Sequence, residues 1–163
     1  MGARGDDDGG SAAGAVYVLF LTTGGLVQSA QKISNSYGSL SSFYTIASND
    51  HFAYSMGSIV DLDGDGVHDL VVGAGGDDDG GSGAGAVYVL CLATDGTVKS
   101  AQKISNSYGG LSSFYTLDSD RFGMSSDSIG DLDGDGVKDI TVGADQDDDG
   151  GSKTGAAYIL FLK

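Results

Sequence analysis

Residues 61–69 read DLDGDGVHD, and the same pattern returns as DLDGDGVKD at residues 131–139. Asp stands at positions 1, 3, 5 and 9 of each copy, so a curled backbone can turn four carboxylates toward one centre. Carboxylates this close repel one another unless a cation neutralises them. A shell of oxygen atoms without Cys or His selects a hard ion such as Ca²⁺. The motif therefore predicts two calcium sites.

The predicted ligands are the four carboxylates of each loop and the backbone carbonyl at position 7. They are Asp61, Asp63, Asp65, Val67 and Asp69 in the first loop, and Asp131, Asp133, Asp135, Val137 and Asp139 in the second. The loop differs from an EF-hand, because Val72 stands where a bidentate Glu is expected at position 12. A solvated Asp/Gly turn without metal is the competing interpretation, and the repetition of the complete spacing favours the metal site.

The composition favours an all-β fold. All 23 acidic residues are Asp, and the 163 residues include 29 Gly and no Pro. Asp and Gly favour turns and are poor helix formers, whereas exposed helices normally carry Glu.

The charge of the chain excludes some partners. The net charge is −15, and two bound divalent ions would bring it to −11 by adding four positive charges. Such a surface repels nucleic acid and anionic membranes. The longest apolar runs have seven residues, too few to cross a bilayer, so no membrane insertion is expected. No signal segment opens the sequence, and we expect any secretion signal to lie outside it.

Three motifs repeat with a period of 70 to 71 residues, which implies a modular array. DDDGGS begins at residues 6, 77 and 147, and SAQKISNSYG begins at residues 29 and 100. GAVYVL begins at residues 14 and 85 and returns as GAAYIL at residue 155.

The central repeat reads as four strands, near residues 52–60, 69–73, 86–92 and 97–104. The third is apolar throughout, as expected for a strand covered on both faces, and the fourth is half polar. Four short antiparallel strands of this kind are typical of a β-propeller blade.

The connections of such a blade separate two faces. In an up-and-down meander, the metal loops lie at the opposite end from the DDDGG turns and from residues 34–50. The face with residues 34–50 is rich in Ser, Tyr, Phe and Asp, and is the predicted contact surface for a protein or glycan partner. The DDDGG turns are either solvated or hold a further cation, through Asp77 and Asp79 in the central copy.

The chain resembles the FG-GAP repeats of integrin alpha-subunit propellers and of bacterial tandem-repeat proteins. The resemblance rests on Phe122-Gly123, on the loop at residues 131–139 and on the Val-Gly-Ala at residues 142–144. It implies a calcium-binding β-propeller, usually extracellular, that acts in adhesion or as a scaffold, with the loop residues given above as metal ligands. The first copy departs from the pattern with Phe52-Ala53, and neither copy has the closing Pro.

The repeats give three blades, of which only the central one is complete. Residues 1–50 form an incomplete first blade with its third and fourth strands, and residues 51–120 form the complete blade. Residues 121–163 form an incomplete last blade with the first three strands. Two repeats do not close a ring, so the open sheet edges require further repeats or other copies of the chain. The chain is expected either as a segment of a longer array or as a subunit of a fibre assembled end to end by strand complementation.

The sequence predicts a non-enzymatic, extracellular or cell-surface protein with a structural or adhesive role. No nucleophile and base recur together, and no phosphate-binding loop is present. The alternatives are a lectin-like module that binds glycans through Tyr44 and Tyr115, and an accessory domain of a secreted hydrolase.

Overall fold

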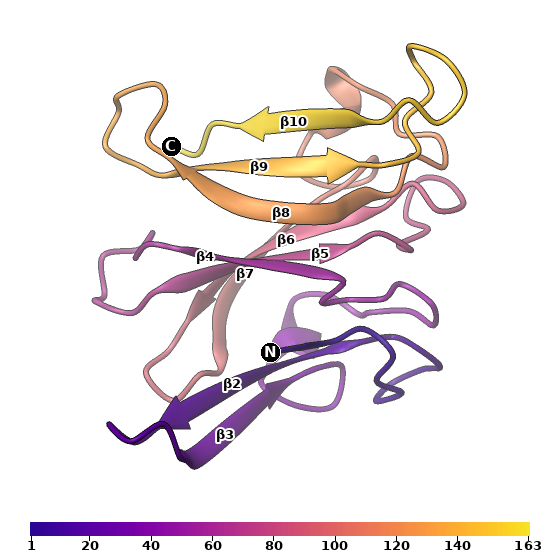
Figure 1. Ribbon diagram of the computed structural model, residues 1–163. Helices are drawn as coiled ribbons and strands as arrows, with labels where there is room; N and C mark the ends of the chain where they lie inside the picture. Colours follow the sequence, from indigo (N-terminus) through magenta and orange to yellow (C-terminus); the bar gives the residue numbers. More distant parts are fainter.

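The chain folds into three antiparallel sheets arranged one after another along the molecule (Figure 1). The computed structural model describes all of residues 1–163. The first sheet contains β1 (Gly2–Ala3), β2 (Ala15–Leu21) and β3 (Val27–Ile33). The central sheet contains β4 (Ser55–Ile59), β5 (Asp69–Ala74), β6 (Ala86–Leu92) and β7 (Val98–Ile104). The last contains β8 (Phe122–Gly130), β9 (Asp139–Ala144) and β10 (Ala156–Leu160).

The only helical segments are two short 3₁₀ turns, η1 (Leu40–Ser42) and η2 (Leu111–Ser113). The prediction of an all-β fold built from antiparallel propeller-type blades without a closed ring is therefore confirmed. The central sheet has four strands, and each outer sheet has three. No helix has the length and apolar character needed to cross a membrane.

Each sheet is a meander in which consecutive strands pair. The central order is β4-β5-β6-β7, so the β4–β5 and β6–β7 turns lie at one end of the blade (Figure 1). The β5–β6 turn and the connection that follows β7 lie at the other end. This separation of the acidic loops from the DDDGG turns agrees with the expectation from sequence.

The two-residue strand β1 was missed by the sequence analysis. Gly2 pairs with Val16 in the first sheet as Gly73 pairs with Val87 in the central sheet, so β1 occupies the place of the second strand of a blade. The sequence contains the signal for this strand, because Gly2-Ala3 and Gly73-Ala74 are separated by 71 residues, the period of the repeat.

The cores lie between neighbouring sheets. Tyr88 and Leu90 of β6 pack toward the first sheet, and Val87 and Val89 pack toward the last. Six of the seven residues of β6 are buried, which confirms that this strand is covered on both faces. The apolar run of β6 is therefore required by two interfaces at once, and each blade contributes stability to its neighbours.

The blades meet where a glycine lies against a phenylalanine of the next repeat. Isolated parallel bridges join Gly14 to Phe52 and Gly85 to Phe122, and both phenylalanine side chains are fully buried. Phe122 also meets the ring of Tyr158 edge-on, with centroids 5.2 Å apart. This packing explains why a phenylalanine opens the Phe-Gly pair. The backbone of Phe122 bridges to Gly85 of the preceding repeat, and its ring contacts Tyr158 of β10.

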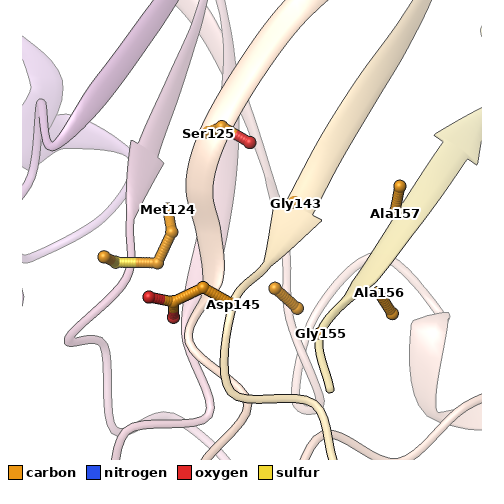
Figure 2. Close-up of a pocket in the computed structure, with 8 residues that line it drawn as sticks. Met124, Ser125, Gly143, Asp145, Gly155, Ala156 and Ala157 are labelled. Atoms are coloured by element: carbon orange, nitrogen blue, oxygen red, sulfur yellow. The ribbon is translucent and has the colours of Figure 1, made fainter. Parts of the chain in front are cut away.

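The outer face of the last sheet lacks the cover that the central sheet receives. A hollow of about 560 Å³ lies there. Figure 2 shows the residues that line it, with Gly143 and Ala157 on β9 and β10 and Ser125 on β8. In the central sheet the equivalent Gly73 lies so close to Gly123 of the next blade that a Cβ would stand 1.9 Å from its carbonyl oxygen. The hollow therefore lies at the position that the next blade covers in the central sheet.

We expect Gly85→Ala to destabilise the protein far more than Gly83→Ala. Both residues have positive φ, of 86° and 62°, so alanine is strained at either position. At Gly85, a Cβ would also lie 2.2 Å from the carbonyl oxygen of Phe122, whereas nothing lies within 4 Å at Gly83. The backbone strain costs about 1–2 kcal/mol, and the forced contact adds about 1–3 kcal/mol. Equal unfolding free energies for the two variants in urea titrations would contradict this account of the blade junction.

Candidate metal centre

The two acidic loops are folded by their own carboxylates. In the first loop, the Asp61 side chain accepts hydrogen bonds from the backbone N–H groups of Gly64 and Gly66, both at 2.7 Å. Asp131 accepts the equivalent bonds in the second loop, including one from Gly134 at 2.7 Å. Gly64 and Gly66 have φ values of 79° and 87°, in the left-handed region that glycine adopts without strain. The glycines therefore permit the turn that gathers the carboxylates.

The last aspartate of each loop joins the loop to the rest of the blade. Asp69 is fully buried, and its two oxygens accept hydrogen bonds from the N–H groups of Leu62, at 2.8 Å, and Leu92, at 3.0 Å. The second loop repeats this arrangement at Asp139. Each carboxylate oxygen has two lone pairs, so these bonds leave acceptor capacity for a cation.

Three of the four predicted carboxylates come together in each loop. One ligand oxygen each from Asp61, Asp63 and Asp69 lies within 4.8 Å of the others, and Asp131, Asp133 and Asp139 repeat the cluster. All donors are oxygen atoms, which fits a hard divalent ion and does not suit zinc or copper. The structure therefore contains two carboxylate clusters of the kind that hold a metal ion.

The fourth aspartate of the first loop is held by a lysine. Lys99, at the start of β7, forms ion pairs with Asp63, at 2.6 Å, and with Asp65. The hydrogen bond from Lys99 lowers the pKa of Asp65, and the hydrogen bonds to Asp63 and Asp65 raise the pKa of Lys99. Asp65 also accepts a bond from the N–H of Val67 at 2.8 Å. Its role as a metal ligand, and that of the Val67 carbonyl, stay predictions.

The second loop has a weaker version of this contact. Lys163 lies 3.2 Å from Asp133, and Asp135 accepts a hydrogen bond from the N–H of Val137 at 2.8 Å. The ligand roles of Asp135 and Val137 likewise stay predictions. Sequence reasoning missed both lysines, because neither is part of the repeated motif.

Two of the three DDDGG turns, which lie at the other end of the blades, hold a lysine ammonium group. In the central blade, Lys103 of β7 lies 2.6 Å from Asp77 and also pairs with Asp79. The Tyr88 hydroxyl donates a hydrogen bond to Asp77 at 3.1 Å, and the side chains of Asp77 and Lys103 are 1% and 2% exposed. In the first blade, Lys32 pairs with Asp6 at 2.8 Å. The sequence contains a signal for these ion pairs, because SAQK recurs at the same distance after DDDGG in the first two repeats. The sequence analysis did not link the lysine of SAQK with the aspartates of DDDGG.

A further buried carboxyl lies beside the Lys103 cluster. Asp50 is 3% exposed and accepts a hydrogen bond from the N–H of Ala47 at 2.7 Å. Burial raises the pKa of Asp50 to about 7, and the nearby Asp77 charge adds to the shift. The corresponding Asp120 of the next connection also has a raised pKa because of burial.

We expect Asp50→Asn to change how stability depends on pH. The pKa of Asp in the unfolded chain is about 3.9, so between that pH and about 7 the folded protein binds more protons than the unfolded chain. The contribution of Asp50 to the unfolding free energy therefore falls as the pH rises through this window. The asparagine oxygen can still accept the bond from Ala47 but does not ionise.

Urea unfolding at pH 5 and pH 8 measures this effect. The variant gains stability relative to the wild-type protein as the pH increases, and parallel pH profiles would contradict the assignment.

Comparison with known proteins identifies the repeat. The model of the FG-GAP repeat family matches residues 52–90 and 122–160, and each match contains one acidic loop and the strands on either side of it. Integrin alpha-2 of Mus musculus is 30% identical to the chain over 133 residues, which is 80% of the chain and 10% of that relative. The chain thus spans about a tenth of the length of the curated relative that it matches. The chain is an FG-GAP repeat protein with propeller-type blades.

Proposed function

We propose that the protein is a non-enzymatic, calcium-binding structural repeat of an extracellular adhesion or scaffold protein. The observation that carries this proposal is the clustering of Asp61, Asp63 and Asp69, which recurs at the same place in the next blade. Two identical oxygen clusters at one end of successive blades suit a stabilising ion better than a substrate. The family supports the extracellular role by analogy alone.

The role of the ion would be to join strands. Asp69 belongs to the cluster and also bonds to Leu92 at the end of β6. A cation on the loop would therefore fix the turn between β4 and β5 against β6 and, through β6, against both neighbouring blades. Calcium removal would loosen the blades without changing their topology.

The open edges support the assembly that the sequence suggested. Either further repeats continue the array, or chains join end to end by strand complementation into a fibre. The glycan alternative is not favoured at Tyr44, because its ring packs edge-on against Tyr88 and Tyr108, at centroid distances of 5.8 and 5.5 Å.

We expect calcium to raise the melting temperature. If free calcium exceeds the dissociation constant tenfold, each site adds about 1.4 kcal/mol. Each kcal/mol corresponds to about 2–4 °C for a chain of this size. Differential scanning calorimetry in millimolar calcium and in EDTA measures the shift, with magnesium as the control for ion size.

Asp63→Asn provides the matched variant for this experiment. Asp63 belongs to the cluster but accepts no backbone hydrogen bond of the loop, so the change removes a ligand and leaves the turn intact. About half of the calcium-induced shift is expected to disappear. Identical melting curves with calcium and EDTA would refute the proposed function.

We expect Lys99→Met to strengthen calcium binding at residues 61–69 only. The Lys99 ammonium lies 2.6 Å from Asp63, so it competes with an ion for that carboxylate. Exposed ion pairs are weak, and the affinity should rise about two- to fivefold. Isothermal titration with calcium measures the change, and the loop at residues 131–139 is the internal reference. A lower affinity would mean that the lysine helps to shape the site.

A further inference from the structure

The outer edge of the last sheet has no partner strand. In the central sheet, β6 pairs with β5 on one side and with β7 on the other. In the last sheet, β10 pairs only with β9, so its other edge presents free backbone donors and acceptors (Figure 1). An exposed edge of this kind is a template for an added strand.

The same edge carries a preformed site for an ammonium group. Asp147 is 4% exposed and accepts hydrogen bonds from the Tyr158 hydroxyl, at 2.8 Å, and from the N–H of Asp149, at 3.3 Å. These are the contacts that Asp77 makes in the central blade with Tyr88, at 3.1 Å, and with the following turn. The carboxylate is therefore buried in the geometry that binds lysine elsewhere in the molecule.

The lysine itself is missing from this third cluster. Lys32 of β3 and Lys103 of β7 each come from the strand that pairs with the third strand of their blade. In the last blade no strand occupies that place, and no lysine pairs with Asp147 or Asp149. The incomplete edge and the unfilled ammonium site thus point to the same absent element.

Apolar surface next to the cluster also lacks its usual cover. Two hollows of about 420 and 510 Å³ lie along β10 and share Leu111, Tyr115, Ile159 and Leu160. Tyr115 is 54% exposed and Phe114 is 82% exposed. In the central blade, the equivalent Tyr44 is covered by Tyr108, which follows β7.

Resting on the strand complementation of the proposed function, we propose that this edge binds an extended polypeptide segment with the pattern of β7, supplied from outside residues 1–163. The segment lies antiparallel to β10, with its lysine opposite Tyr158 as Lys103 lies opposite Tyr88. The ammonium group binds Asp147 and Asp149. The aliphatic residue after the lysine enters the apolar hollow, and an aromatic residue five positions after the lysine covers Tyr115.

A second copy bound through its own β10 is a poorer occupant. Pairing of β10 with β10 would bring two acidic clusters together without a lysine, on chains that each carry a net charge of −15. The lysines of β3 and β7 are already engaged within their own blades. The charge of the edge therefore selects a basic strand.

The test uses a fluorescent peptide with the sequence of residues 93–109, ATDGTVKSAQKISNSYG, titrated with the full chain. Fluorescence anisotropy is expected to show saturable binding. Hydrogen exchange is expected to show new protection in β10 when the peptide is bound. The titration is repeated in EDTA. Peptide binding without calcium then tests this proposal independently of the proposed calcium sites.

Two matched controls identify the lysine contact. A peptide with both Gln102→Lys and Lys103→Gln keeps its composition and charge but moves the lysine to the opposite face of the strand. It should bind at least about tenfold more weakly. In the protein, Asp147→Asn should weaken binding to a similar degree. Asp148→Asn makes the same change in charge at an exposed neighbour and should have little effect.

The exchanged peptide keeps the test valid even if Asp147→Asn fails to fold. Equal affinity of the native and exchanged peptides would overturn the proposal, because binding would then depend on charge alone. Absence of binding at millimolar peptide would overturn it as well.

Discussion

The pairing of buried carboxylates with donors is the interaction on which this structure depends. The chain contains 23 Asp against eight Lys and Arg, and the repeats concentrate the Asp in turns. At one end of the blades, Asp77 is buried against Lys103 and Tyr88. At the other end, Asp61 and Asp69 are held by backbone N–H groups. Because amide donors carry no net charge, this second end keeps an excess of negative charge that attracts a cation.

The two kinds of acidic turn also connect the blades to one another. Asp69 bonds to β6, which packs against both neighbouring sheets, and the backbone of Asp50 accepts a hydrogen bond from the N–H of Gly76 at 3.1 Å. A change at one turn is therefore transmitted to the next blade through hydrogen bonds and the shared core. This coupling between nearest neighbours is how repeat proteins gain stability without long-range contacts.

Much of the fold was predictable from the sequence, because the period and the apolar runs are strong local signals. The first predicted strand was too long at its start: β4 begins at Ser55, since Phe52 bridges to Gly14 and Ala53 adopts a φ of 69°. In the last blade the strand β8 begins at Phe122, although Gly123 also has a positive φ, of 95°, and the pairing register shifts between Phe122 and Ser125.

The site was predictable only where its residues lie close together in the sequence. The spacing of aspartates in the loop identified Asp61, Asp63 and Asp69 as metal ligands, and the structure gathers them into one cluster. It gave no indication that Lys99 would approach from β7, or that Lys103 would meet Asp77 across 26 residues. Such pairs depend on strand register, which the pattern of one strand does not fix alone.

The most direct test of the central claim is a crystal structure of the protein grown in millimolar calcium, with anomalous diffraction to identify the ion. The account predicts a calcium peak in each loop, bound by Asp61, Asp63 and Asp69 and by their counterparts in the last blade. Two ordered loops without an anomalous peak would contradict it.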